Sequence, residues 1–489
     1  MKLFDVVQNI EHTGGSEDWV RRIEYDSRKA CPGDLFVCLP GGQRDGHDYA
    51  PQAYENGCRM FLCQKKLELP EDAVQVITPD TRAALAVISA DFYDHPADRL
   101  HLIGITGTKG KTTTALLIAA VLNAAGKNCA YIGSNGVIIN GKHTETVNTT
   151  PESRDLHHYF NLMTDASVRY AVLEVSSQAL AHHRVDGIPF ETVVFTNLSE
   201  DHIGPGEHPD FADYRDSKRR LFTSHRAKYA VYNADDPAAA YMLQGFHGKE
   251  ISYGIRKEAD YNAYNLAQYR TSTALGVEFD FFSGSRSEHV QLMSPGIFSV
   301  YNGLAAIAVC EIFGVSRDFA AGVLEKTPIQ GRFEIVPGIP ERTFIIDYAH
   351  NGLSLTSALM TLREYKPNRL ICVFGSIGGR TKGRRRELAE AASALADYCI
   401  ITSDNPDFEP PEDIVNEIAS YMSADCDYEC ILDRREAIFR AVEMSQKEDI
   451  VLFAGKGHET FQLIYGKKEP FIEREIILEA CREFSPRPL

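Results

Sequence analysis

The chain reads TGTKGKTTT at residues 106–114, and this stretch decides the fold of its central part. An apolar run at 100–105 precedes it and predicts a buried strand, and the Ala/Leu-rich segment 115–125 after it predicts a helix that ends at Gly126. A glycine-rich turn between a strand and a helix is a place where backbone N–H groups and the positive helix end bind phosphate oxygens. An ordinary glycine turn is the less favoured alternative.

The residue types of this turn suit a nucleoside triphosphate. The Lys111 ammonium would neutralise phosphate charge, and the Thr112 hydroxyl could bind Mg²⁺. The general P-loop pattern is not fully met, because Ile105 stands five residues before Gly110, so we predict a variant loop. The predicted nucleotide-binding residues are Gly107, Thr108, Lys109, Gly110, Lys111, Thr112 and Thr113.

Composition narrows the class of protein. With 489 residues, we expect about two to four domains. A net charge of −17 argues against a nucleic-acid surface, and 11 cysteines without a C-x-x-C pair argue against a disulfide framework or a zinc ribbon. The amino-terminal residues do not resemble a signal peptide, and no apolar run is long enough to span a membrane. We therefore expect a cytoplasmic protein that binds neither nucleic acid nor membranes.

The order of predicted elements indicates an α/β fold of three domains. Strands alternate with helices over 99–327, and a turn-rich segment then opens another αβ series. We predict a small amino-terminal α/β domain at 1–98, a central doubly wound, P-loop ATPase-like domain at 99–327, and a Rossmann-like carboxy-terminal domain at 328–489. The last third holds four apolar runs that each end in a polar or glycine-rich turn. Because ligands bind at the carboxyl ends of strands in open α/β sheets, these turns predict a site-bearing face.

Two strand ends downstream of the phosphate turn carry Glu174 and His202. Taken alone, each is better explained as a helix-capping carboxylate or a polar turn residue. Beside a phosphate loop, a carboxylate and an imidazole at adjacent strand ends suit a second Mg²⁺ site.

Eight segments of the chain together resemble the Mur ligases, ATP-dependent enzymes of peptidoglycan precursor synthesis. They are TGTKGKTTT, EVSSQAL, FTNLSEDH, DYRDSKRRLF, NADDP, GRFE, DYAH and GKGHE, in this order. Five more point to the branch that adds the third residue of the peptide: YDSR at 25–28, GDLF at 33–36, DGHD at 45–48, NTTP at 148–151 and DNP at 404–406. The resemblance covers essentially the whole chain.

The resemblance implies an amide ligase that adds a diamino acid to UDP-N-acetylmuramoyl-L-alanyl-D-glutamate. ATP would phosphorylate the D-glutamate side-chain carboxylate, and the incoming amine would attack the acyl phosphate. The implied cofactors are ATP and Mg²⁺, because an anionic acceptor meets an anionic donor. The amino-terminal domain would bind the UDP-substrate and the carboxy-terminal domain the amino acid, in an enzyme that we expect to be a monomer.

The resemblance also implies roles for individual residues. Thr112 and Glu174 would hold one Mg²⁺ ion, and His202 would help to hold the other. Lys218 corresponds to a lysine that the family carries as N6-carboxylysine, whose carbamate could place the second ion; an unmodified helix-surface lysine is the alternative. The implied catalytic residues are Lys111, Lys218 and His202, and the implied ATP contacts are Asn302, Arg332 and Asp347. The implied substrate contacts are Ser27, Asn148, Thr149, Thr150, Ser176 and Arg184, with Asp404, Asn405, Asp407, Gly455 and Glu459 for the amino acid.

Three segments depart from the family pattern. The family usually carries an aspartate, a tyrosine and a histidine soon after the residues matching Asp201-His202, where this chain has a differently built loop at 203–211. Asn351-Gly352 replaces a common threonine-proline pair, and the basic loop 378–384 lacks an aspartate. A divergent paralogue therefore stays an alternative. From another class, the alternative is a P-loop NTPase without ligase activity.

The choice of amino acid rests on one position. Family members that add meso-diaminopimelate carry an arginine after the DNP turn, which binds the distal carboxylate, whereas this chain has Asp407. An aspartate would repel a second carboxylate and attract a cation, so we expect L-lysine or a similar basic amino acid such as ornithine. The alternative is meso-diaminopimelate, with Asp407 capping the following helix while Arg380 or Lys382 binds the carboxylate.

Overall fold

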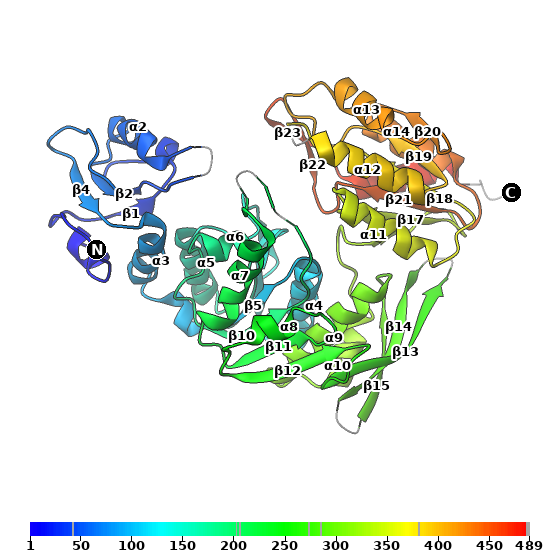
Figure 1. The fold of residues 1–489 in the computed structure, drawn as a ribbon, viewed down its shortest axis with the longest axis horizontal. Coiled ribbons are helices and arrows are strands. Elements are labelled where there is room, and N and C mark those ends of the chain that lie inside the picture. The colour runs from blue at the N-terminus through cyan, green and yellow to red at the C-terminus, as the bar shows by residue number, and fades with distance from the viewer. Residues whose placement is uncertain are drawn as a thin grey trace. The chain divides into compact units, whose positions relative to one another are not determined.

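The computed structural model describes residues 1–41, 44–201, 203–204, 207–271, 274–283, 286–379 and 382–485. The chain forms two compact units. Unit 1 comprises 1–262 with 304–317, and unit 2 comprises 263–303 with 318–489. Figure 1 shows their helices and strands along the chain.

A four-stranded parallel sheet forms the amino-terminal part of unit 1. Its order is β1 (Arg22–Glu24), β2 (Asp34–Val37), β3 (Met60–Cys63) and β4 (Val74–Ile77). Helices α1 (Leu3–Val7) and α3 (Thr81–Phe92) share one apolar core with the sheet, and α2 (Ala50–Glu55) shares another. Leu35 and Val37 belong to the first core and Phe36 to the second, as the two-residue period of a strand requires.

The rest of unit 1 is built on a mainly parallel sheet with β5 (His101–Thr106) in the middle. On one side follow β10 (Phe190–Phe195), β11 (Tyr229–Asn233) and β12 (Lys249–Gly254). On the other side follow β9 (Tyr170–Glu174) and β6 (Cys129–Gly133), then the antiparallel β7 (Gly136–Ile139) and β8 (Lys142–Thr144). The helices are α4 (Lys111–Ala124), α5 (Ser153–Asp165), α6 (Ser177–Ala181), α7 (Phe211–Thr223) and α8 (Ala239–Leu243).

This strand order brings three site-bearing strand ends together. Ile105 of β5 pairs with Glu174 on β9 and with Val194 on β10, in parallel register on both sides. The phosphate turn therefore leaves the sheet directly between the residues that follow β9 and those that follow β10. The predicted helix after the turn is confirmed, and Gly126 beyond its end adopts a positive φ of 72°.

Unit 2 begins within β13 (Tyr261–Arg270) and continues through the antiparallel strands β14 (Leu275–Ser283) and β15 (Arg286–Leu292). Helices α9 (Ile297–Ile312) and α10 (Arg317–Leu324) have residues in both units. A six-stranded sheet follows, in the order β16 (Glu334–Val336), β17 (Thr343–Asp347), β21 (Ile450–Ala454), β18 (Leu370–Phe374), β19 (Tyr398–Ile401) and β20 (Asp427–Cys430). Only β16 runs antiparallel to its neighbour in this sheet.

Helices cover both faces of this sheet. One core includes side chains of α11 (Gly352–Arg363), α12 (Lys382–Leu395) and α13 (Pro411–Ser420), and the other includes side chains of α14 (Arg434–Met444) and α15 (Glu473–Phe484). A hairpin of β22 (Phe461–Ile464) and β23 (Lys467–Pro470) lies between β21 and α15 in the chain. The four apolar runs predicted as strands in the last third are strands β17, β18, β19 and β21.

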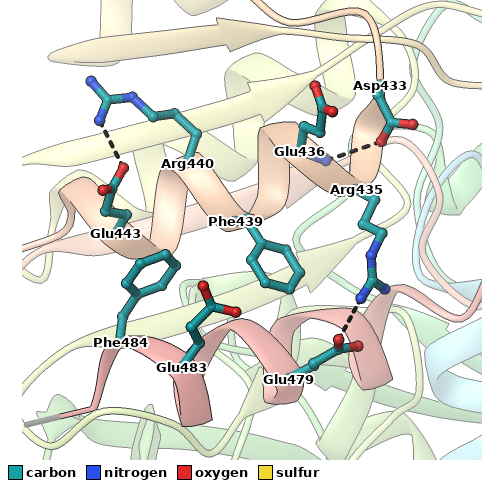
Figure 2. Close-up of a pocket in the computed structure, with 9 residues that line it drawn as sticks. All are labelled: Asp433, Arg435, Glu436, Phe439, Arg440, Glu443, Glu479, Glu483 and Phe484. Atoms are coloured by element: carbon teal, nitrogen blue, oxygen red, sulfur yellow. Dashed lines mark hydrogen bonds and ion pairs between the residues drawn. The ribbon is translucent and has the colours of Figure 1, made fainter.

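A buried ion pair joins α14 to α15. Arg434 Nε lies 2.8 Å from Glu473 Oε1, and both side chains are almost completely buried. Arg434 also donates to the Ala454 carbonyl at 2.9 Å, at the end of β21. The same two helices carry an exposed pair, Arg435 and Glu479, in a surface groove of about 590 Å³ (Figure 2).

Glu473→Ala is expected to destabilise unit 2 by about 3 kcal/mol or more, because it leaves the Arg434 guanidinium buried without its carboxylate. Glu479→Ala is the matched control on the same helix, and should cost less than about 1 kcal/mol because that pair is solvated. Urea unfolding, followed by far-UV circular dichroism, measures the free energy of unfolding of both variants. Similar small losses of unfolding free energy in the two variants would show that the buried pair stabilises the protein no more than the exposed pair does.

Candidate active site

The phosphate loop of unit 1 has a backbone that requires glycine. Gly107 and Gly110 have φ values of 150° and 85°, and a Cβ on Gly107 would stand 1.9 Å from Thr196 Oγ1. The turn after β10 holds the loop in place. Asn197 Oδ1 accepts from the Lys109 N–H at 2.9 Å, and Thr196 Oγ1 donates to the Lys109 carbonyl at 2.7 Å. The loop is therefore preformed, as an anion-binding turn needs to be.

Two lysine side chains meet at one carbonyl of this loop. Lys111 Nζ and Lys218 Nζ each donate to Gly107 O at 2.9 Å. Lys218 comes from α7, is 1% exposed, and lies 4.5 Å from the centre of the Tyr214 ring. Burial, with the nearby charge of Lys111, lowers the pKa of Lys218 well below its usual value, against an opposing effect of Asp201. Lys218 is thus a buried group of the site and not a lysine on the helix surface.

Thr112 and Glu174 provide adjacent oxygen atoms. Thr112 Oγ1 donates to Glu174 Oε2 at 2.9 Å, and the buried Glu174 carboxylate also accepts from Tyr131 OH at 2.5 Å and from the Ser134 N–H at 3.0 Å. The Glu174 carboxylate caps no helix: the cap of α6 is Ser176. A hydroxyl and a carboxylate beside a phosphate loop fit Mg²⁺, which takes one or two protein ligands and completes its shell with phosphates and water.

The second predicted metal position is only partly described. His202 lies outside the described residues, so its predicted metal-binding and catalytic roles stay predictions. Within the described ranges, no group of three or more His, Cys, Asp or Glu side chains is arranged to hold a metal ion by itself.

The predicted acceptor-substrate residues gather at the end of β9. Thr150 Oγ1 donates to the Glu174 carbonyl at 2.7 Å and accepts from the Ser176 N–H at 3.1 Å. Arg184 donates to the Thr150 carbonyl at 3.1 Å, and its Nε lies 2.9 Å from the Glu152 carboxylate. Burial lowers the pKa of Arg184, and the charge of Glu152 opposes this. Thr149 Oγ1 is 3.1 Å from Ser134 Oγ, and Asn148 is half-buried beside it in the chain.

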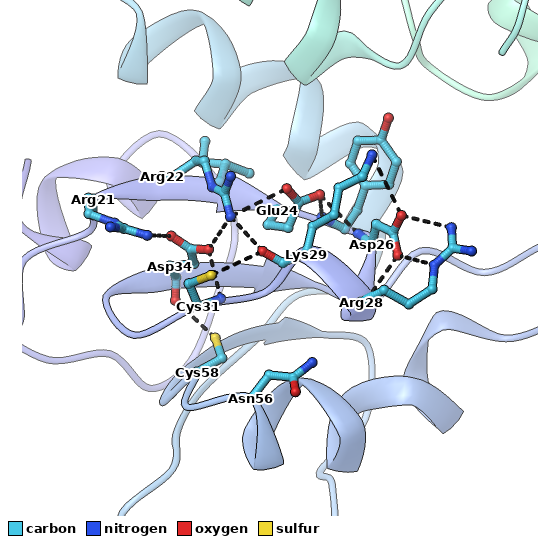
Figure 3. A network of polar contacts seen from close by, with 12 residues as sticks. Arg21, Arg22, Glu24, Asp26, Arg28, Lys29, Cys31, Asp34, Asn56 and Cys58 are labelled. Atoms are coloured by element: carbon cyan, nitrogen blue, oxygen red, sulfur yellow. Dashed lines mark hydrogen bonds and ion pairs between the residues drawn. The ribbon is translucent and has the colours of Figure 1, made fainter.

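The predicted uridine contact, Ser27, lies in the amino-terminal part of unit 1. Its hydroxyl donates to Gln52 Oε1 at 2.6 Å, and its carbonyl accepts from Asn56 Nδ2 at 2.8 Å. A polar network fixes the preceding backbone (Figure 3): Asp26 caps the turn after it, and Glu24 accepts from the backbone N–H of Asp26 at 3.0 Å. The contact of Ser27 with a uridine stays a prediction.

The predicted amino-acid residues of unit 2 converge on a lysine that sequence reasoning missed. Lys456 Nζ is fully buried and donates to Asn405 Oδ1 and Glu459 Oε2, both at 2.8 Å. Asn405 Nδ2 donates to the same Glu459 oxygen at 2.9 Å. Asp404 is 2% exposed with its Oδ1 3.8 Å from Lys456 Nζ, and burial raises the pKa of its carboxyl. Gly455 must be a glycine, because a Cβ there would stand 2.7 Å from Asp404 Oδ2.

Asp407 has a structural partner. Its Oδ1 accepts from the Gly466 N–H at 2.8 Å, and its backbone pairs with the hairpin through Leu463 O and the Tyr465 N–H, each at 2.9 Å. The alternative in which Asp407 caps the following helix is wrong, since Pro410 stands at the start of α13. The alternative carboxylate ligands, Arg380 and the side chain of Lys382, lie outside the described residues, so their role stays a prediction.

The remaining predicted ATP contacts lie in unit 2. Asp347 ends β17, is 8% exposed, and accepts from the Phe333 N–H at 2.9 Å. The Arg332 guanidinium lies 4.9 Å from the centre of the Tyr348 ring, and Asn302 is buried within α9. Contacts of these three residues with a nucleotide stay predictions.

Comparison with known proteins places the whole chain. Three family models match it: "Mur ligase family, catalytic domain" over 20–93, "Mur ligase middle domain" over 105–310 and "Mur ligase, glutamate ligase domain" over 331–457. The chain is 38% identical to proteins named UDP-N-acetylmuramoyl-L-alanyl-D-glutamate--2,6-diaminopimelate ligase from Caldanaerobacter subterraneus subsp. tengcongensis and Clostridium botulinum. Each alignment spans 99% of this chain. The two alignments span 99% and 100% of the respective relatives.

Solved structures agree with this placement. A structure titled as a UDP-N-acetylmuramoyl-L-alanyl-D-glutamate--2,6-diaminopimelate ligase is 30% identical, with a TM-score of 0.69 and 99% of both chains covered. The Thermotoga maritima MurF ligase, solved in complex with ADP, is 16% identical with a TM-score of 0.61 over 95% of this chain and 98% of its own, and supports the fold alone. The predicted α/β fold of three domains is confirmed, while the boundaries at 98 and 327 stay predictions.

Proposed function

Because this chain belongs to the Mur ligase family of ATP-dependent amide ligases, we propose that it joins a diamino acid to UDP-N-acetylmuramoyl-L-alanyl-D-glutamate through an acyl phosphate. The observation that carries the proposal is the meeting of Lys111 and Lys218 at the Gly107 carbonyl, beside the Thr112–Glu174 pair. Positive charge and oxygen ligands stand together where a triphosphate would lie.

The residues of unit 1 suit phosphoryl transfer to a carboxylate. The loop N–H groups and Lys111 would hold the triphosphate, and Thr150, Ser176 and Arg184 would hold the acceptor. Mg²⁺, when bound at Thr112 and Glu174, would offset the charge between two anions. Thr112 and Glu174 bond to each other at 2.9 Å, so the hydroxyl is already aimed at the carboxylate with which it would share the ion.

A carbamate on Lys218 is part of the proposal. The neutral amine is the form that attacks CO₂: the nitrogen bonds to carbon, the electron pair of one C=O π bond moves onto that oxygen, and water takes up one proton from the nitrogen. The product is a carboxylate-like anion. The lowered pKa of buried Lys218 supports this, because it raises the fraction of neutral amine. The anion would also attract the nearby Lys111 ammonium.

We propose meso-diaminopimelate as the incoming amino acid. The relatives above are named for 2,6-diaminopimelate, which supports this choice better than the lysine expected from Asp407. That expectation required an Asp407 carboxylate directed at the amino acid, whereas its Oδ1 accepts from the Gly466 N–H. Phosphate release, with mass spectrometry of the UDP product and dropout of each substrate, tests the ligation.

Diaminopimelate is expected to give a kcat/KM at least about tenfold above those of lysine and ornithine, since a site that binds a distal carboxylate is left with unpaired polar groups by an analogue that lacks one. The three amino acids are compared at saturating ATP and UDP-dipeptide. A clear preference for lysine or ornithine would return Asp407 to the role that the sequence suggested.

Asp407→Asn and Asp407→Arg separate a structural role from substrate contact. Asparagine keeps an oxygen for the Gly466 N–H, so activity should stay within about threefold of the wild type, whereas arginine removes the acceptor and should raise the KM for the amino acid. Steady-state kinetics with varied amino acid measures both. A large loss in Asp407→Asn would mean that the charge itself contacts the substrate.

The setting of the reaction is also proposed. No helix of the described part of the chain is long and apolar enough to cross a membrane. Eleven unpaired cysteines support a reducing, cytoplasmic location. A monomeric state stays a prediction.

A further inference from the structure

The segment 203–211, which departs from the family pattern, carries a buried histidine of unit 1. His208 is 2% exposed. Its Nδ1 lies 2.6 Å from Asp213 Oδ2 on α7, and its Nε2 lies 2.9 Å from Ser177 Oγ, the first residue of α6. The His208 carbonyl accepts from the Gly204 N–H at 3.0 Å.

The two ring contacts hold the imidazole at both nitrogens. An ionised carboxylate only accepts, so Nδ1–H donates to Asp213, and Nε2 lies within hydrogen-bond distance of the Ser177 hydroxyl. The order Asp213–His208–Ser177 is that of a hydrogen-bonded relay, but Ser177 and His208 are each 2% exposed. Burial of both groups suits a role in holding elements together and not one in attacking a substrate.

The elements that His208 joins, α6 and α7, contact two different parts of the candidate site. Ser177 directly follows Ser176, which caps α6 and contacts Thr150 on the acceptor side. On the other side, the His208 ring packs edge-on against Tyr214, with ring centres 5.4 Å apart. Tyr214 OH is 3.0 Å from Thr108 Oγ1 of the phosphate loop, and its ring lies beneath Lys218 Nζ.

We propose that His208 is a positioning residue that couples the acceptor side of the site to the phosphate loop, through Ser177 on one side and Asp213 and Tyr214 on the other. The identity of the acceptor substrate in this inference rests on the proposed function. The position of the nucleotide rests on the geometry of the phosphate loop in unit 1. Without the imidazole, α6 and α7 lose their bond through the loop, and Tyr214 loses the surface that sets its hydroxyl against Thr108.

The test measures binding of a non-hydrolysable ATP analogue with Mg²⁺, together with kcat. His208→Ala should weaken analogue binding about tenfold and lower kcat/KM by about 10- to 100-fold. This is the usual range for residues that orient ligand-binding groups without contacting the ligand themselves. His208→Gln should retain more activity than His208→Ala, because its amide can still bond to Ser177. His225→Gln is the matched control: it replaces another buried imidazole of unit 1, bonded to the Ile188 carbonyl and packed on Phe190.

A double-mutant cycle separates coupling from a general loss of stability. The losses of His208→Ala and Tyr214→Phe in analogue binding should not add, whereas those of His208→Ala and His225→Gln should add. If His208→Ala does not fold, Asp213→Asn replaces it in both cycles. Additive losses with Tyr214→Phe, or an effect of His208→Ala no larger than that of His225→Gln, would overturn the proposal. Absence of ligation by the wild type would instead refute the proposed function, and the binding cycle would still decide the role of His208.

Discussion

Lys111→Ala is expected to lower kcat by about 10²-fold or more, with a smaller change in the stability of the protein. The Lys111 ammonium lies at the Gly107 and Thr108 carbonyls, 2.9 and 3.1 Å away, at the start of α4. From there it can follow the charge that builds up on the transferred phosphoryl group, and loss of one such preorganised donor typically costs this much.

Lys127→Ala is the control for the Lys111 variant. Lys127 follows the same helix at its other end, where its ammonium lies 5.5 Å from the centre of the Tyr170 ring. Its loss should leave kcat within about twofold of the wild type, since it is remote from the phosphate loop. Equal activity of both variants in the ligation assay would contradict the assignment of nucleotide binding to this loop.

Lys218→Ala is expected to be as severe as the Lys111 variant, and a small carboxylate should partly restore it. Alanine removes the buried amine and with it the proposed carbamate, and leaves a space beside Gly107 that acetate could enter. Native mass spectrometry of the wild type in bicarbonate should show the added mass of one CO₂, and Lys218→Ala should lack it.

Lys228→Ala provides the comparison, because Lys228 is exposed and paired with Glu191 at the surface. It should keep the added CO₂ and full activity. A wild-type protein that carries no added mass in bicarbonate, together with a Lys218→Ala variant that acetate does not improve, would leave Lys218 as an unmodified buried amine.

Most of the strands and helices could be predicted from the sequence, because they carry strong local signals. The phosphate turn is indicated by its glycines, which adopt positive φ in the structure. The buried strands β17, β18, β19 and β21 are indicated by short apolar runs with polar ends. The pairing of β5 with both β9 and β10, which assembles the site, depends on contacts between distant segments and has no local signal.

The roles that sequence reasoning missed are set by tertiary contacts. From the sequence, Asp407 is expected to face the amino acid, but a hairpin more than fifty residues later supplies the N–H of Gly466 to its carboxylate. Lys456 lies in the GKGHE segment, yet only the fold shows that it joins Asn405 to Glu459. In the sequence His208 is part of a segment that departs from the family pattern, and only the fold shows that it contacts α6 and α7.

Isotope transfer tests the central claim most directly. UDP-N-acetylmuramoyl-L-alanyl-D-glutamate labelled with ¹⁸O in the D-glutamate side-chain carboxylate is incubated with ATP, Mg²⁺ and diaminopimelate, and the released phosphate is analysed by mass spectrometry. An acyl phosphate transfers one carboxylate oxygen to phosphorus, so the account predicts one ¹⁸O atom in the phosphate and one in the new amide. Unlabelled phosphate, or label in AMP instead, would contradict it.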